Sequence, residues 1–189
     1  IFTPKEVAAY MADFFEFPFC KFSLLDPGAG TGILLSAVCQ RIIEKDDAPT
    51  HVRIDAYEND LGVLPYLHAT MKACSDSFLE RGITFEYNVF GEDFILANYS
   101  YACPKGALSK NKETHLYDAV ISNPPYYKLN KGSQHAHLME PFISGQPNIY
   151  SLFMVLSSHM VREGGDIVVI TPRSFCSGLY YRNIREWFV

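Results

Sequence analysis

Four consecutive residues, Asn123-Pro124-Pro125-Tyr126, hold the densest group of chemically useful atoms in this sequence of 189 residues. They follow a short apolar run, residues 119–121, which predicts a buried strand. A residue before proline is restricted to extended backbone, so we expect Asn123 to be held at the end of that strand. Proline lacks an N–H, which leaves the nearby carbonyls without local donors. These acceptors and the Tyr126 ring could hold a planar group that carries an NH2. The alternative is a proline-rich turn without chemistry.

A glycine-rich turn, Asp26-Pro27-Gly28-Ala29-Gly30-Thr31-Gly32, lies between a predicted strand and a predicted apolar helix. Glycine permits positive φ and lets a ligand lie against the backbone. The spacing is G-x-G-x-G. A dinucleotide-binding turn would need glycine where Ile33 stands, and no Gly-Lys-Ser/Thr of a phosphate-binding loop follows. Alone, the turn is also compatible with a purely structural role.

Carboxylates end two further predicted strands. Glu58 stands at a strand tip, where it can accept both hydroxyls of a ribose. Asp93 follows another strand and could accept from an adenine amino group, with Phe94 packed on the ring. Together with Asp26, these residues indicate an adenosine-type ligand without a pyrophosphate. The alternatives are an exposed acid for Glu58 and a capped turn with a core phenylalanine for Asp93 and Phe94.

The alternation of strands and helices predicts an α/β fold with a doubly wound, mostly parallel sheet. We expect strands at residues 22–26, 52–58, 83–89, 117–122 and 166–171. Helices are expected at residues 3–15, 33–43, 60–81 and 148–162, with another beginning at 179. Residues 98–116 and 127–147 are predicted to be irregular. Ligands bind such sheets at the carboxyl ends of the strands, where all the residues described above fall.

The first helix has a predicted start signal. Thr3 is expected to cap it, with Pro4 at the first helical position and Glu6 completing a capping box. Its apolar face is predicted to contain Val7, Met11, Phe14 and Phe15.

Composition limits the classes of protein. No apolar run is long enough to span a membrane, and the first residues lack the pattern of a signal peptide, so a cytoplasmic location is expected. The five cysteines form no C-x-x-C pair, which predicts reduced thiols and no zinc site. His135 and His137 have no suitably spaced ligand partner and are predicted to be loop residues. Because the chain does not begin with Met, we expect it to be a piece of a longer protein.

Charge is unevenly distributed. The net charge is −5, unlike that of a free-standing nucleic-acid binder. Residues 99–147, however, hold five lysines against three acidic residues, on both sides of Asn123. Lys128, Lys131 and Arg173 are the candidates for contact with a phosphate backbone. The alternative is a solvated loop with scattered lysines.

The motifs, in their order along the chain, resemble those of a known family. The order is residues 2–8 with Thr3-Pro4, the turn at 26–32, Glu58, Asp93-Phe94, residues 123–126 and then 166–175. This is similar to S-adenosylmethionine-dependent DNA adenine-N6 methyltransferases of the gamma motif order, in which the recognition domain follows the catalytic domain. Type II modification enzymes and bifunctional restriction–modification proteins belong to that class.

The resemblance implies a Rossmann-like class I methyltransferase domain over residues 1–189, truncated after the fifth strand and without its recognition domain. It implies S-adenosylmethionine as cofactor and double-stranded DNA with a flipped adenine as partner, in a bacterial or archaeal cytoplasm. A recognition domain, and in a bifunctional protein a nuclease, would lie elsewhere in the parent chain.

The resemblance also implies roles for individual residues. Those implied for catalysis are Asn123, Pro124, Pro125 and Tyr126, with no metal. Those implied for the cofactor are Thr3, Pro4, Asp26, Gly28, Ala29, Gly30, Thr31, Gly32, Glu58, Asn59, Asp93, Phe94 and Asn123. Those implied for nucleic acid are Tyr126, Lys128, Lys131 and Arg173.

The same residues are also compatible with other functions. RNA-adenine and protein-glutamine methyltransferases also use Asn-Pro-Pro-Tyr, although the Thr3-Pro4 segment and the long loop at 127–147 favour DNA. A different class of function is a cofactor-binding fragment with no activity of its own.

Overall fold

The described strands form one parallel sheet in the order β3-β2-β1-β4-β5. The computed structural model describes residues 3–18, 20–102, 116–142, 148–177 and 185. The strands are β1 (Lys21–Asp26), β2 (His51–Tyr57), β3 (Thr84–Phe90), β4 (Tyr117–Ser122) and β5 (Val161–Val169). The prediction of a parallel α/β sheet with these strands is confirmed. The order reverses between β1 and β4, and this switch point is where such sheets bind ligands.

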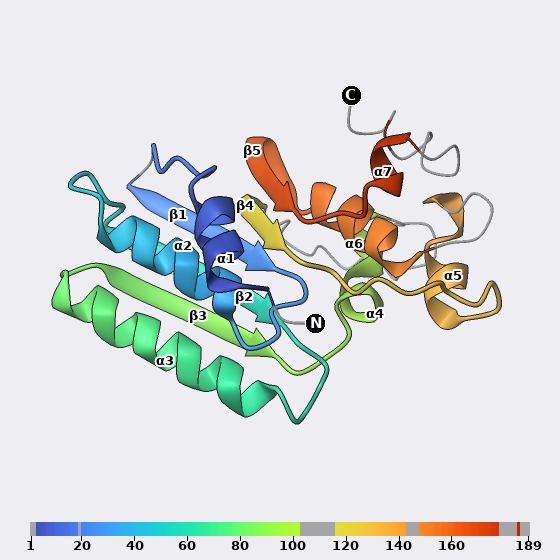
Figure 1. Ribbon diagram of the computed structural model, residues 1–189, viewed down its shortest axis with the longest axis horizontal. Coiled ribbons are helices and arrows are strands. Elements are labelled where there is room, and N and C mark those ends of the chain that lie inside the picture. Colours follow the sequence, from blue (N-terminus) through green and yellow to red (C-terminus); the bar gives the residue numbers. More distant parts are fainter. Residues whose placement is uncertain (1–2, 19, 103–115, 143–147, 178–184, 186–189) are drawn as a thin grey trace.

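Helices cover both faces of the sheet. They are α1 (Lys5–Ala12), α2 (Ile33–Ile43), α3 (Leu64–Glu80), α4 (Phe94–Asn98), α5 (Gln134–Leu138), α6 (Ile149–Ser158) and α7 (Ser174–Ser177). Short 3₁₀ turns occupy Tyr99–Tyr101 and Glu140–Phe142. The first three helices share one buried apolar cluster with the sheet, and α4 and α6 share a second cluster on the other face. The fold is therefore doubly wound, and α4 and α5 lie beyond the arrowheads of the strands (Figure 1).

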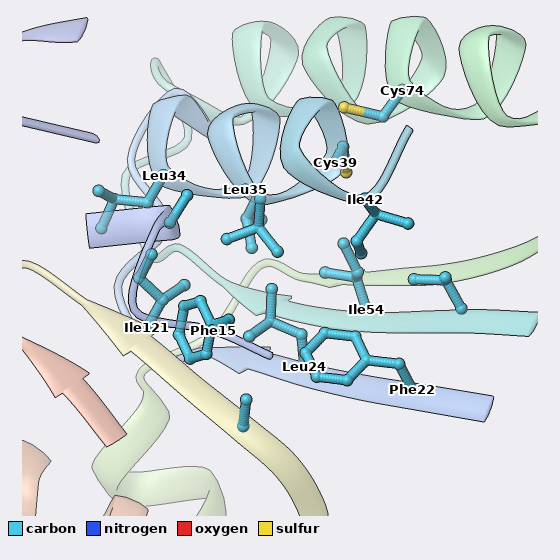
Figure 2. Packing of buried hydrophobic residues seen from close by; sticks show 14 of the residues in the cluster. Phe15, Phe22, Leu24, Leu34, Leu35, Cys39, Ile42, Ile54, Cys74 and Ile121 are labelled. Carbon is cyan, nitrogen blue, oxygen red and sulfur yellow. The ribbon is translucent and has the colours of Figure 1, made fainter. Parts of the chain in front are cut away.

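The larger core lies between α2 and the sheet. Leu24 and Ile121 come from the neighbouring strands β1 and β4, and Leu35 of α2 packs above them (Figure 2). These three side chains are fully buried. Cys39 and Cys74 belong to the same cluster, between α2 and α3, and the cysteines in the described part of the chain are free thiols. This core fixes the strand tips that carry the site.

The prediction for the start of α1 was wrong, and the prediction for its buried face was right for Met11 and Phe15 but wrong for Val7 and Phe14. Pro4 is the N-cap, no side chain caps the helix, and the Thr3 hydroxyl is used elsewhere. Val7 is 38% exposed and Phe14 is 57% exposed. The buried residues are Ala8, Met11 and Ala12 of the helix and Phe15 just after it, which follow the i, i+3, i+4, i+7 spacing of a single helix face.

Other boundaries also differ from the predictions. The helix expected to reach residue 162 ends at Ser158, and β5 already begins at Val161. Gly164 and Gly165 therefore lie inside a strand. At Gly165 a Cβ would lie 2.6 Å from the Asp118 carbonyl oxygen of β4, so only glycine fits this irregular pairing. The loop at 127–147 contains α5, whereas residues 103–115, 143–147 and most of 178–189 lie outside the described part.

Candidate active site

A cavity of about 600 Å³ opens at the carboxyl ends of the strands, around the switch point. This volume suits a small organic ligand or cofactor. The residues predicted for the site that line it are Gly28, Gly30, Glu58, Asn59, Asp93, Phe94, Asn123, Pro124, Pro125 and Tyr126. Those predicted for the cofactor that do not line it are Thr3, Pro4, Asp26, Ala29, Thr31 and Gly32.

The glycine turn is braced by Glu58. Gly30 has φ +56° and donates its N–H to Glu58 Oε2 at 2.9 Å. The other carboxylate oxygen, Oε1, accepts from the Asp60 N–H at 2.8 Å. Glu58 thus joins the tip of β2 to the turn after β1, while its side chain still faces the cavity. Each carboxylate oxygen keeps a second lone pair for a ligand hydroxyl.

Gly32 serves the packing of helices. It is the N-cap of α2 with φ +85°, and a Cβ there would lie 3.0 Å from side-chain atoms of both Leu67 and Thr70. The Thr70 hydroxyl also donates to the Thr31 carbonyl at 2.8 Å. These contacts fix the back of the turn against α3, which explains why Thr31 and Gly32 are absent from the cavity wall.

Asp26 is a fully buried carboxyl group directly behind the turn. Its Oδ1 accepts from the Gly28 N–H at 3.1 Å, and its buried Oδ2 has no hydrogen-bond partner among the described residues. Burial raises the pKa of Asp26 to about 7; the Gly28 N–H partly opposes this, and the nearby charge of Glu58 adds to it. An orphaned buried carboxylate oxygen of this kind is suited to a cationic ligand group such as an ammonium.

Asp93 has two partners at the opposite side of the cavity. Its Oδ1 accepts from the Leu96 N–H at 2.9 Å and so caps α4, which is the capped turn considered as an alternative above. Its Oδ2 lies 2.9 Å from Nε2 of His135. Phe94 is buried, with its ring centroid 5.3 Å from that of Phe153. Both Asp93 and Phe94 nevertheless line the cavity.

The stretch at 123–126 extends from the tip of β4. The Asn123 Nδ2 donates to Thr3 Oγ1 at 2.9 Å, across 120 positions of sequence. The Tyr126 hydroxyl lies 2.7 Å from Asn123 Oδ1 and 2.8 Å from the Ile170 carbonyl oxygen. Burial raises the pKa of Tyr126, so this hydroxyl keeps its proton and donates at neutral pH.

The Pro124 carbonyl is a second acceptor in this stretch. No hydrogen bond from the described residues reaches it, as the two prolines predicted. Pro124 lies in the cavity wall with Asn123 and Tyr126, whose side chain is 44% exposed. The cavity wall therefore contains two residues that carry oxygen acceptors, beside an aromatic residue that is partly exposed.

The cationic side chains predicted to contact nucleic acid are exposed. Lys128 and Lys131 follow the stretch at 123–126, and Arg173 follows β5, so all three lie after the carboxyl ends of strands. Lys105, Lys110 and Lys112 lie outside the described part of the chain.

Several residues at the site were not predicted from the sequence. Tyr57, Val63 and Phe153 line the cavity. Phe153 is 8% exposed, and a Cβ on Gly28 would lie 3.5 Å from its ring. The prediction that His135 and His137 are loop residues was wrong, because both belong to α5, and His135 contacts Asp93. His135 lies 42 positions after Asp93, and nothing in the sequence indicated that the two side chains are in contact.

No group of three His, Cys, Asp or Glu side chains among the described residues could hold a metal ion. No helix in the described part of the chain is long and apolar enough to cross a membrane.

Comparison with known proteins identifies relatives over nearly the whole chain. The family described as Eco57I restriction-modification methylase matches residues 51–189. The type II methyltransferase M.BsuBI of Bacillus subtilis is 34% identical over 187 residues, covering 98% of this chain and 36% of the relative. The type II methyltransferase M.PstI of Providencia stuartii is 30% identical over 181 residues, covering 95% and 34%. The chain thus spans about a third of the length of these curated relatives.

Solved structures agree on the fold. A putative class I S-adenosylmethionine-dependent methyltransferase from Listeria monocytogenes superposes with a TM-score of 0.66 at 17% identity, covering 97% of this chain and 49% of that one. A methyltransferase subunit of a type I restriction-modification system from Streptococcus thermophilus gives 0.63 at 18% identity, covering 98% and 37%. The predicted class I methyltransferase fold is therefore confirmed.

Proposed function

Because this chain belongs to the Eco57I restriction-modification methylase family, we propose that its protein transfers a methyl group from S-adenosylmethionine to the N6 amine of a flipped-out adenine in DNA, as the modification activity of a restriction–modification system. The observation that carries the proposal is the pair of acceptors in the cavity wall, Asn123 Oδ1 and the Pro124 carbonyl. They stand beside an accessible tyrosine ring and at the sheet edge that carries the glycine turn.

The residues around the cavity fit S-adenosylmethionine. The orphaned Oδ2 of Asp26 suits the ammonium of the methionine end, which would then lie over Gly28 and Gly30. Glu58 would accept from the ribose hydroxyls and Asp93 from the adenine amino group. No cradle for a pyrophosphate is required by this ligand. When bound, it supplies an electrophilic methyl group on a sulfonium.

Asn123 and Pro124 act on the nucleophile. The exocyclic amine of adenine is a poor nucleophile because its lone pair is delocalised into the ring. Acceptance of its two hydrogens by Asn123 Oδ1 and the Pro124 carbonyl favours a pyramidal nitrogen with a localised lone pair. The same oxygens stabilise the positive charge that grows on nitrogen, and their fixed positions avoid reorganisation during the reaction. Alignment of the two reactants in one cavity supplies much of the remaining rate. The proton that then leaves nitrogen passes to solvent.

Access to this cavity requires an extruded base. An amine paired inside a duplex cannot reach acceptors at the tip of β4, so the adenine must be flipped out, at a cost of a few kcal/mol. Stacking on the Tyr126 ring offsets part of this cost, by about 1–3 kcal/mol. The Tyr126 hydroxyl now contacts Asn123 and Ile170. To stack on the base, the Tyr126 ring must therefore either break these contacts or tilt while it keeps them.

The test is methyl transfer by the full-length protein. Three parallel reactions each contain the protein and methyl-labelled S-adenosylmethionine. The substrate is long mixed-sequence duplex DNA in the first, RNA in the second and a release-factor protein in the third. The DNA is then digested to nucleosides and analysed by mass spectrometry. Label in N6-methyladenine is the expected result. Label in N4-methylcytosine, or label confined to RNA or protein, would refute the adenine-DNA assignment. Calorimetric binding of the cofactor by the full-length protein, without transfer to any substrate, would instead support a cofactor-binding protein with no methyltransferase activity.

A further inference from the structure

The Asn123 amide is held at both ends. Its Nδ2 donates to Thr3 Oγ1 at 2.9 Å, and its Oδ1 accepts from the Tyr126 hydroxyl at 2.7 Å. An amide presents either an acceptor or a donor to a ligand, depending on which end faces it. A target amine donates its hydrogens and therefore needs Oδ1. With Oδ1 facing the amine, Nδ2 must point away from it and find an acceptor elsewhere.

Thr3 supplies that acceptor. Among the described residues, Thr3 Oγ1 is the one acceptor within hydrogen-bond distance of Asn123 Nδ2. Without it, the productive orientation of the amide would leave a partly buried donor unsatisfied, which is costly. The rotated amide would place an NH2 group against the NH2 of the target. The Thr3 hydroxyl thus stabilises the orientation that chemistry requires.

The backbone makes the Thr3 hydroxyl available for this task. The N-cap residue of helix α1 is Pro4, and no side chain caps the helix, so the Thr3 hydroxyl is not used for capping. The Pro4 carbonyl accepts from the Ala8 N–H at 3.0 Å, and Ala8 and Ala12 are buried in the core, which anchors the helix start. A residue before proline is also restricted to extended backbone. Thr3 is therefore held in place at the tip of β4, outside the cavity wall.

We propose that Thr3 is a positioning residue, which accepts a hydrogen bond from Asn123 and so keeps Oδ1 facing the target amine. The inference rests on the proposed function and deepens it. It gives Thr3 a role different from contact with the cofactor, and the two roles make opposite predictions.

Thr3→Val and Thr3→Ser in the full-length protein separate these roles. Valine keeps the shape and the β-branching but has no hydroxyl, whereas serine keeps the hydroxyl. We expect Thr3→Val to lower kcat by about tenfold, the effect of one lost hydrogen bond, with an unchanged Kd for S-adenosylmethionine. Thr3→Ser should retain kcat. A weaker cofactor affinity with unchanged kcat, or equal damage by both substitutions, would overturn the proposal.

A second measurement does not depend on activity. With 15N-labelled asparagine, the Asn123 side-chain NH2 signal is identified by its absence in Asn123→Asp. We expect its exchange with water to be faster in Thr3→Val and unchanged in Thr3→Ser, with the signal of Asn130 as an internal control. Unchanged exchange in Thr3→Val would refute the positioning role. If the wild-type protein transfers no methyl group, the proposed function fails, whereas this comparison still decides whether Thr3 holds Asn123.

Discussion

Nε2 of His135 lies 2.9 Å from Oδ2 of Asp93, so helix α5 is tied to the residue that caps helix α4. Both side chains are largely shielded, with 19% and 23% of their surfaces exposed. The contact connects the segment that follows residues 123–126 to the far wall of the cavity. It makes the position of α5 sensitive to what Asp93 binds.

Replacement of His135 by alanine should loosen α5. We expect the free energy of unfolding to fall by about 0.5–1.5 kcal/mol, the net value of a typical hydrogen bond. Hydrogen exchange of residues 134–138 should accelerate, since α5 spans little more than one turn and depends on tertiary contacts. The matched control is His137→Ala on the exposed side of the same helix. Equal exchange in the two variants would show that the contact with Asp93 does not hold α5.

Asn123→Ala should separate chemistry from cofactor binding. We expect methyl transfer to fall by at least 10²-fold, because one of two preorganised acceptors for the target amine is lost. The Kd for S-adenosylmethionine should stay within about twofold of wild type, since Asp26, Glu58 and Asp93 are untouched. Transfer assays and calorimetry measure the two quantities. Asn130→Ala, in the exposed loop that follows, is the control. Cofactor affinity lost in parallel with activity would contradict this division of roles.

The buried carboxyl group of Asp26 predicts a pH-dependent stability. Its folded pKa of about 7 lies above the ordinary value of 3.8. Between these values the folded chain binds a proton that the unfolded chain has released, so the stabilisation is complete at low pH and is lost as pH rises through 7. From about pH 5 to pH 8, the free energy of unfolding of the wild type should fall relative to Asp26→Asn by at most about 3 kcal/mol. Parallel urea titrations of both proteins measure the difference, and equal pH profiles would contradict it.

Cofactor binding should act on the same proton. A cationic ligand group beside Oδ2 favours the ionised carboxylate, so binding near pH 6 should release a proton from Asp26. Calorimetry in buffers of different ionisation enthalpy counts that proton. The release should disappear in Asp26→Asn. Proton release that is equal in both proteins would place its source elsewhere.

Much of the framework could be predicted because its signals are local. A strand that enters a glycine turn, and a strand that ends in Asn123-Pro124, are specified by neighbouring residues. The parallel order of the sheet then brings their tips together. The buried face of α1 could be predicted only in part, because Val7 and Phe14 are as apolar as the residues that are buried in their place. Only packing against α2 selects the face that contains Ala8 and Ala12.

The pairings between distant residues could not be predicted. Thr3 and Asn123 are 120 positions apart, and nothing in the local pattern of either residue names the other. Thr3 also matched the local pattern of a capping box, but in the fold its hydroxyl contacts Asn123 and does not cap the helix. Likewise, His135 and His137 have the same local context, and only the docking of α5 brings one of them to Asp93. These contacts, which set the orientation of the site, are products of the whole fold.

Lys131 is predicted to contact DNA through its charge alone. Lys131→Ala should weaken binding of duplex DNA by the full-length protein, uniformly across sequences. It should also reduce the slope of log K against log salt by about 1, because one phosphate contact releases about one counterion. Binding titrations between about 50 and 200 mM salt measure both effects.

The control is Lys21→Ala. Lys21 is also exposed, but it begins β1 and therefore lies at the amino ends of the strands, away from the cavity. It carries the same change in net charge, so a long-range effect of charge would alter both variants alike. A reduced slope in Lys131→Ala alone would place the phosphate backbone at the loop that follows Tyr126. Equal slopes in the two variants would mean that DNA approaches the cavity by another surface.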